Sequence, residues 1–170
     1  MLALLPVIAR PFGATGYGLL LGSFGLGALG GAAVLPRLKR QYSVDGLVAS
    51  AILVFALMTS LSGEARSFGL LAGILFVSGV AWIGILACLN VAAQTMSPPA
   101  LRARSLSLYL LVLQGGMAIG STLWGALATR QGVPRTMLYA SAALAFGLLT
   151  IRKHRLSVHD LQFAPSVVRD

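Results

Sequence analysis

Charged residues divide the sequence into long uncharged stretches, and the lengths of these stretches predict the secondary structure. No charged residue lies between Arg10 and Arg37, and the next uncharged stretch runs from Asp45 to Glu64. A membrane-spanning helix needs about 20 mainly apolar residues. By this measure the sequence predicts five complete spans, at about residues 16–35, 46–62, 67–90, 105–129 and 136–151.

The first nine residues are apolar but too few to cross a membrane. Residues 1–9, MLALLPVIA, rise only about 13 Å as a helix, against a hydrocarbon core about 30 Å thick. They run directly into Arg10 and Pro11, without the basic start of a signal peptide. We interpret residues 1–9 as the end of a truncated transmembrane helix. The expected fold class is all-α: a polytopic transmembrane helix bundle with five complete spans plus the end of a sixth.

The composition agrees with an integral membrane protein and excludes two other classes. Of the 170 residues, 57% are hydrophobic and 10% are charged, whereas soluble domains carry about 25% charged residues. Disordered chains are poor in apolar residues, so disorder is excluded. The net charge of +9 does not indicate nucleic-acid binding, because a basic patch needs a polar surface around it. The lipid bilayer is therefore an expected partner, and nucleic acid is not.

Lysine and arginine residues fall unequally on the two sides of the predicted bundle. If the spans alternate, four of the 13 lie on one side, at Arg10, Arg66, Arg130 and Arg135, and the other nine lie opposite. Cytoplasmic loops are enriched in these residues. We therefore expect the C-terminus, including a tail at residues 156–170, in the cytoplasm and the N-terminus outside.

Basic residues on the predicted cytoplasmic side cluster in two loops. These candidates are Arg37, Lys39, Arg40, Arg102 and Arg104. One interpretation of Arg37, Lys39 and Arg40 is that they latch the C-terminus of a neighbouring helix or an acidic partner in one state of the protein. The other is that they anchor the topology by binding anionic lipid headgroups.

Glycines recur at four-residue spacing in two of the predicted spans. The pairs are Gly18 with Gly22, Gly27 with Gly31, and Gly116 with Gly120. Small residues at this spacing let helix backbones approach closely in membranes. The first span carries glycines on two faces, as expected of a helix packed from both sides. This helix-packing pattern is compatible both with a static bundle and with a helix that slides or rocks.

Polar side chains inside the spans are the candidates for contact with a small-molecule substrate. No Asp, Glu, Lys, Arg or His lies in the five spans, so they offer no site for a coupling ion. The cavity-lining candidates are Gln114, Asn90, Ser23, Ser121 and Tyr109. Gln114 either lines an aqueous cavity or bonds to another helix, and helix bonding is favoured for Asn90. Trp82 and Trp124 are expected at packing or interface positions.

No residue pattern supports an enzyme, a metal site or a cofactor. Cys88 is the single cysteine, and His154 and His159 have no clustered third ligand, whereas zinc sites use three or four protein ligands. The sequence lacks the motifs of zinc proteases, serine hydrolases and phosphate-binding loops. We therefore expect no catalytic residue, no metal and no cofactor.

Short motifs near the predicted helix ends carry a resemblance to a known family. Leu4–Arg10 reads LLPVIAR, a glycine-rich span leads to the basic segment Pro36–Arg40, and Pro98–Arg104 reads PPALRAR. In these segments the chain resembles the C-terminal half of a major facilitator superfamily (MFS) transporter. It is similar to the bacterial branch that includes siderophore and drug exporters and transmembrane secretion effectors. Pro36, Lys39 and Ala103 depart from the residues usual in that family.

The resemblance implies a fold and a function for residues 10–155, the C-terminal MFS-like half. It implies a multi-pass protein of the bacterial inner membrane that takes part in efflux of small amphipathic molecules, such as drugs or siderophores. Transport would proceed by alternating access between two halves. The implied partner is an N-terminal six-helix half or a second copy, and the chain is expected to be inactive without it.

Two alternatives from other classes stay open. In the first, the chain is a half-size transporter that works as a homodimer. In the second, it is a membrane scaffold that does not transport. A homodimer needs a complete six-helix half, whereas a scaffold needs packing glycines but no polar groups that line a cavity. Access of water to Gln114 and Ser121 discriminates the scaffold from either kind of transporter.

Overall fold

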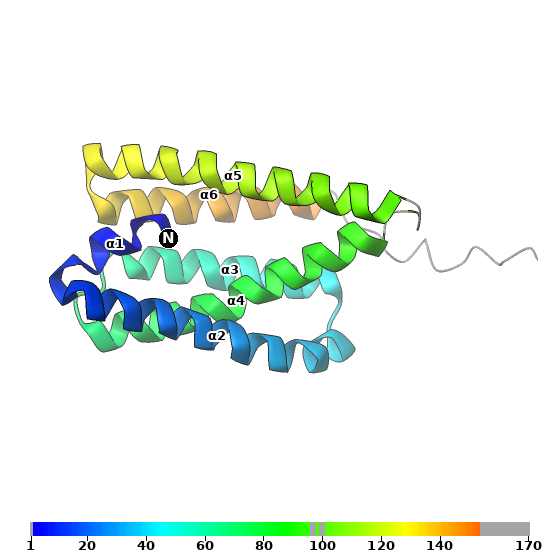
Figure 1. Cartoon of the computed structure of the whole chain (residues 1–170), viewed down its shortest axis with the longest axis horizontal. Coiled ribbons are helices and arrows are strands. Elements are labelled where there is room, and N and C mark those ends of the chain that lie inside the picture. Colours follow the sequence, from blue (N-terminus) through cyan, green and yellow to red (C-terminus); the bar gives the residue numbers. More distant parts are fainter. Residues whose placement is uncertain (1, 96–97, 99–100, 154–170) are drawn as a thin grey trace, which may run out of the picture.

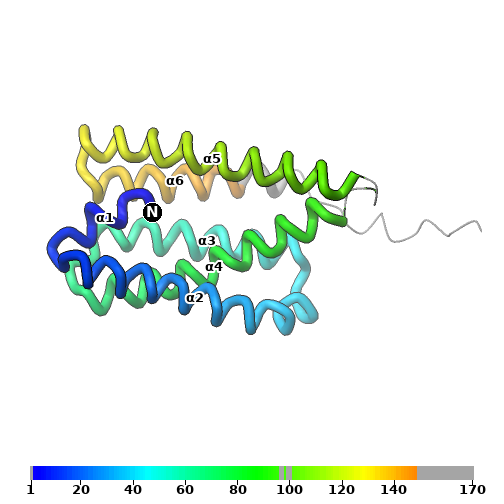
Figure 2. Tube along the Cα trace, viewed as in Figure 1, coloured from blue at the N-terminus to red at the C-terminus, as the bar shows by residue number. Residues whose placement is uncertain are grey.

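The chain forms a bundle of long helices that run up and down in turn (Figures 1 and 2). The computed structural model describes residues 2–95, 98 and 101–153, and within them the structure is helical and without strands. The long helices are α2 (Gly13–Gln41), α3 (Val44–Ser62), α4 (Phe68–Thr95), α5 (Arg102–Gln131) and α6 (Val133–Lys153). The expected tail at residues 156–170 and both histidines lie outside the described residues.

Four helices in the described part are long and apolar enough to cross a membrane. They lie at Arg10–Gln41, Val44–Ser62, Phe68–Thr95 and Arg102–Gln131, where the first four spans were predicted. The fifth predicted span, at residues 136–151, lies within α6, and its role as a span stays a prediction. The all-α, multi-pass class is therefore confirmed, whereas the count of five spans plus the end of a sixth is not.

Residues 2–12 form three short helical turns that lead into α2. These turns are η1 (Leu2–Leu4), α1 (Leu5–Ile8) and η2 (Arg10–Phe12). Pro6 and Pro11 stand near the starts of α1 and η2, where a missing N–H is tolerated because it would have no helical partner. Gly13, with a φ of 68°, then redirects the chain. The assignment of residues 1–9 to the end of a spanning helix stays a prediction.

The short N-terminal turns pack into the main hydrophobic core at one end of the bundle. The buried residues of this core are Leu5, Ala9, Leu20, Leu71 and Leu75. Beside it, the rings of Phe12 and Phe68 meet edge to face with centroids 5.4 Å apart, a favourable arrangement for aromatic pairs. The core therefore joins the N-terminal turns to α2 and α4.

Glycine brings the backbones of α2 and α4 into direct contact. A Cβ added to Gly27 would overlap the carbonyl oxygen of Phe76, and a Cβ added to Gly79 would overlap the carbonyl oxygen of Phe24. A Cβ at Gly31 would lie 2.9 Å from a backbone carbon of α4. Close backbone contact of this kind is a principal way in which membrane helices associate. The crossing therefore depends on the absence of side chains at these three positions.

The remaining helices join this pair mainly through α3, and α5 also contacts α4 directly. Helix α3 packs against α4 and α6, and α6 packs against α5. Figure 1 shows α5 and α6 side by side along one face of the group formed by α2, α3 and α4. The hydroxyls of Thr59, Ser62 and Thr136 are buried in this region, and each donates to a backbone carbonyl three or four residues earlier. These hydroxyls thus find their hydrogen-bond acceptors nearby in the chain and not on a neighbouring helix.

Helix α2 continues beyond the span predicted at residues 16–35. It runs through Pro36 and ends at Gln41, with Lys39 and Arg40 in its last turn. Proline inside a helix removes one backbone hydrogen bond, whereas basic side chains in the last turn interact favourably with the helix dipole. The basic segment Pro36–Arg40, which was expected in a loop, is therefore helical, since α2 extends beyond the apolar stretch that ends at Leu35.

Substituting Gly27 with alanine is expected to destabilise the bundle. The added methyl group would overlap the Phe76 carbonyl, and overpacking of this kind costs about 1–3 kcal/mol. The matched control is Gly22→Ala on the same helix, where a Cβ meets nothing within 4 Å and helix propensity improves by about 0.5–1 kcal/mol. Thermal unfolding of both variants in detergent checks the prediction, which fails if Gly27→Ala unfolds at or above the midpoint of Gly22→Ala.

Candidate functional site

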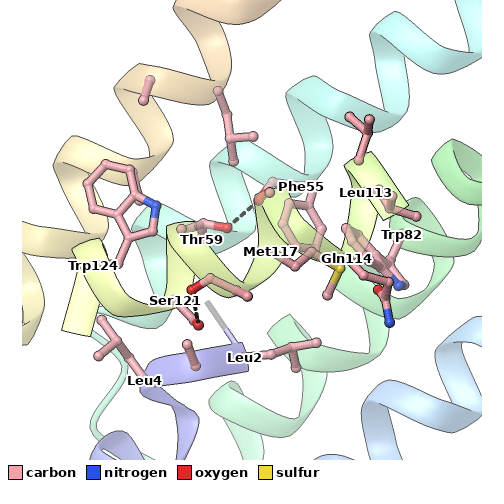
Figure 3. Close-up of a pocket in the computed structure, with 18 residues that line it drawn as sticks. Leu2, Leu4, Phe55, Thr59, Trp82, Leu113, Gln114, Met117, Ser121 and Trp124 are labelled. Carbon is pink, nitrogen blue, oxygen red and sulfur yellow. Dashed lines mark hydrogen bonds between the residues drawn. The ribbon is translucent and has the colours of Figure 1, made fainter. Parts of the chain in front are cut away.

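A cavity of about 900 Å³ lies between α5 and the helices that face it. Its walls come from α3, α4, α5 and α6, and Leu2, Ala3 and Leu4 line it from the N-terminal turns. Figure 3 shows these walls with the lining side chains as sticks. Ligand pockets in proteins enclose about 300–1,000 Å³, so the cavity has room for a small organic molecule.

Helix α5 supplies one long wall of the cavity. The residues Leu113, Gly116, Met117, Gly120 and Trp124 line it, and positions three or four apart lie on one side of a helix. No residue of α5 is buried, and a Cβ added at Gly116 would meet nothing within 4 Å. This wall of α5 therefore stays open to the cavity.

Aromatic side chains line the cavity on three of its helices. Phe55 of α3 and Trp82 of α4 pack with ring centroids 5.6 Å apart and an interplanar angle of 35°. Trp124 of α5 lies ten residues beyond Gln114, a separation of about 15 Å along a helix axis. Figure 3 shows Trp124 on the opposite side of the view from Trp82 and Gln114. Both tryptophans of the chain thus line this one cavity.

Polar groups are sparse on the cavity wall, and the hydroxyls are already hydrogen-bonded. The Ser121 hydroxyl donates to the carbonyl of Ala118 at 2.8 Å, and the Thr59 hydroxyl donates to the carbonyl of Phe55 at 2.7 Å. The side-chain amide of Gln114 is exposed and forms no hydrogen bond with any described residue. Gln114 therefore retains its capacity both to donate and to accept.

The cavity wall carries no charge. None of the 18 lining residues within the described ranges has an ionisable side chain. On α5 the arginines lie outside the lining stretch, with Arg104 before Val112 and Arg130 after Trp124. In the part of the chain that the structure describes, no three His, Cys, Asp or Glu side chains gather as a metal site would require. The site can therefore offer apolar contact and hydrogen bonds, but no charge to pair with a ligand.

Two of the five polar candidates from the sequence meet at this cavity. Gln114 and Ser121 line it, whereas Asn90, Ser23 and Tyr109 are not among its lining residues. Ser23 donates to a carbonyl of its own helix at 3.1 Å, and Asn90 is half-buried on α4. The Tyr109 hydroxyl is buried and has no hydrogen-bond partner among the described residues. Contact with a substrate stays a prediction for all five.

The six candidate packing glycines have different surroundings. Gly27 and Gly31 meet the α4 backbone, and Gly116 and Gly120 line the cavity. A Cβ added at Gly18 or Gly22 would meet nothing within 4 Å. Close packing is therefore observed at one of the three glycine pairs, and a packing role for the other two pairs stays a prediction.

The five basic candidates lie at one end of the bundle, because successive long helices run in opposite directions. Figure 1 shows the end of α2 and the start of α5 on the same side, and these segments carry Arg37, Lys39, Arg40, Arg102 and Arg104. The helix ends on the other side carry Arg10, Arg130 and Arg135, and Arg66 lies there in the connection between α3 and α4. This grouping agrees with alternation of the spans, and which end faces the cytoplasm stays a prediction.

Four lining residues could not be singled out from the sequence. Trp82 and Trp124 were expected at packing or interface positions, and Phe55 and Thr59 were not considered. Phe55 and Thr59 are four residues apart and share a face of α3. In a helix that is apolar on all sides, however, this spacing does not distinguish a cavity wall from a face that meets lipid.

The long apolar helices define the class of the chain, a multi-pass α-helical membrane protein. A family model described as a transmembrane secretion effector matches residues 1–168. The chain therefore belongs to the transmembrane secretion effector family of the major facilitator superfamily, whose members are transporters and not enzymes. This confirms the resemblance found in the sequence. No curated protein and no solved structure gave a significant match.

Substituting Tyr109 with phenylalanine is expected to leave the stability unchanged or to raise it. The hydroxyl is buried without a partner in the described part of the chain, and an unpaired buried group of this kind costs about 1–3 kcal/mol. The control is Thr59→Val, which removes a hydroxyl that donates to a carbonyl and is expected to lower stability by about 0.5–1.5 kcal/mol. Thermal unfolding in detergent compares the two. A clear loss of stability in Tyr109→Phe would contradict an unpartnered hydroxyl.

Proposed function

We propose that this chain is the C-terminal half of an exporter of small amphipathic molecules, such as drugs or siderophores. Its family supports a role in transport. The observation that carries the proposal is the cavity beside α5, with about 900 Å³ of space, mainly apolar walls and the unpaired amide of Gln114. Pockets that bind small organic molecules combine apolar surface with a few polar groups in this way.

The packing of the helices favours transport by alternating access around this cavity. Alternating access moves one helix group against another around a site near the middle of the membrane. The backbone contact between α2 and α4 makes a close-packed group on one side of the cavity. Helix α5 lies on the other side and contributes no buried residue, so it is the wall that moves with least loss of packing.

The exposed surface of α5 supports a second half as a partner. Leu111, Ile119 and Leu123 do not line the cavity and are exposed by 70%, 64% and 64%. An N-terminal six-helix half packed against α5 would bury this surface and complete the walls of the transport path. The alternatives are a second copy in a homodimer, and a non-transporting scaffold in which the surface meets only lipid.

The proposed topology has five complete spans, with α6 as the last and residues 1–9 as the end of a sixth. The end of the bundle that carries Arg37, Lys39, Arg40, Arg102 and Arg104 is assigned to the cytoplasm of a bacterial inner membrane, because cytoplasmic ends are rich in these residues. The N-terminus then lies outside. Since the predicted spans hold no ionisable side chain apart from tyrosine and cysteine, a coupling-ion site would belong to the partner half.

Cysteine labelling tests whether the cavity is open to water in the membrane. In a Cys88→Ala background, Gln114→Cys and Ser121→Cys are expected to react with a polar maleimide about tenfold faster than Ile119→Cys, because a thiol forms its reactive thiolate only where water reaches it. Ile119 is the matched control, since it is exposed on the same helix but does not line the cavity. Equal and slow labelling at all three positions would favour the scaffold.

A transport assay tests whether the chain needs a partner half. The purified chain in liposomes is expected to bind a dye substrate but not to move it across the membrane, because half of the transport path is missing. Empty liposomes measure passive leakage of the dye. Dye movement above this leakage with the chain alone would contradict the proposal and favour a homodimer.

A further inference from the structure

The absence of charge on the cavity wall limits what the cavity can hold. All 18 lining residues in the described part are neutral, and an ionised group taken out of water without a partner carries a large free-energy penalty. The hydroxyls of Thr59 and Ser121 donate their hydrogens to backbone carbonyls. A ligand with a permanent charge would therefore lose its hydration and gain no ion pair.

The aromatic walls favour ligands with rings. The tilted pair of Phe55 and Trp82 presents ring surface from α3 and α4, and Trp124 presents a second indole from α5. Aromatic pairs in offset or edge-to-face contact gain stabilisation beyond that of the area that they bury. A planar aromatic ligand gains this contribution, whereas a flexible aliphatic ligand of equal size does not.

The wall offers free hydrogen-bond donors, beside acceptor oxygens on Gln114, Thr59 and Ser121. Each indole supplies an N–H that cannot accept, and the Gln114 amide supplies two N–H groups and one carbonyl. Neither tryptophan nor Gln114 forms a hydrogen bond with a described residue. A ligand that carries acceptors, such as carbonyl or ether oxygens, would match these donors.

From these three observations we propose that the cavity binds uncharged aromatic molecules that carry hydrogen-bond acceptors, and that it discriminates against the same ring systems when they are charged. The proposal rests on the proposed function, because it specifies the substrate class of the same cavity. It narrows the class of amphipathic molecules to neutral aromatic ones.

The two tryptophans make the cavity directly observable, because they are the only ones in the chain and both line it. Energy transfer from tryptophan to a bound naphthalene dye therefore reports occupancy of the cavity. N-phenyl-1-naphthylamine and 8-anilino-1-naphthalenesulfonate share one ring system and differ in the charged sulfonate. With the purified chain in nanodiscs, the neutral dye is expected to bind at least about tenfold more tightly, a difference of about 1.4 kcal/mol.

A matched pair of glycine variants separates binding in the cavity from partition into lipid. Gly116→Phe places a ring in the cavity and is expected to weaken binding of the neutral dye about tenfold or more. Gly115→Phe adds the same ring one position away, at a residue that does not line the cavity and also has no atom within 4 Å of an added Cβ. This control is expected to keep the affinity within about twofold.

The role of the donors is tested with prodan, a neutral naphthalene dye that carries a carbonyl oxygen. Gln114→Leu removes the amide and is expected to weaken prodan binding about fivefold, with little effect on N-phenyl-1-naphthylamine, which lacks a carbonyl. Asn90→Leu is the control, since Asn90 does not line the cavity. Unchanged prodan binding in Gln114→Leu would overturn the part of the proposal that concerns acceptors.

The outcomes distinguish failure of this inference from failure of the proposed function. Equal affinities for the neutral and the sulfonated dye, both weakened by Gly116→Phe but not by Gly115→Phe, would overturn the neutral class and leave ligand binding in the cavity intact. Energy transfer that Gly116→Phe does not reduce for any dye would overturn the proposed function as well. Tighter binding of the neutral dye, lost only in Gly116→Phe, would support both.

Discussion

The contact between the backbones of α2 and α4 is the constraint on which the other helices depend. Gly27 and Gly79 each place a bare Cα against a carbonyl oxygen of the opposite helix, at positions where a methyl group does not fit. Hydrophobic burial gives little drive between helices in lipid, so close van der Waals packing has to supply the association. Helix α3 then packs on α4, and α6 packs on α3.

The position of α5 follows from this order of packing. It contacts its neighbours at the edge of the bundle and buries none of its own residues, although it is the longest helix in the described part of the chain. One side of α5 becomes a wall of the cavity, with Gln114 and Trp124 on it. The cavity is thus a consequence of close packing elsewhere, because α5 packs on α4 less closely than α2 does and leaves space beside it.

The sequence was sufficient to predict where the helices lie, but not which face of each helix packs against a neighbour. Charges such as Arg10, Asp45 and Glu64 divide the apolar stretches because charges are costly inside a bilayer, so the first four spans were correctly predicted. The pair Gly18 and Gly22 has the same four-residue spacing as the pair Gly27 and Gly31, yet only the second pair meets the backbone of α4. Which side of an apolar helix meets a neighbour depends on the other helices, and sequence spacing within one helix does not contain that information.

The central claim is that a water-filled, ligand-sized cavity lies beside α5 in the membrane, and tryptophan quenching tests it most directly. Both tryptophans line the cavity, so their emission in liposomes should be quenched strongly by acrylamide in the water and weakly by brominated lipid chains. The reverse result, with strong quenching by brominated chains and little by acrylamide, would show that these side chains face lipid and would contradict the account.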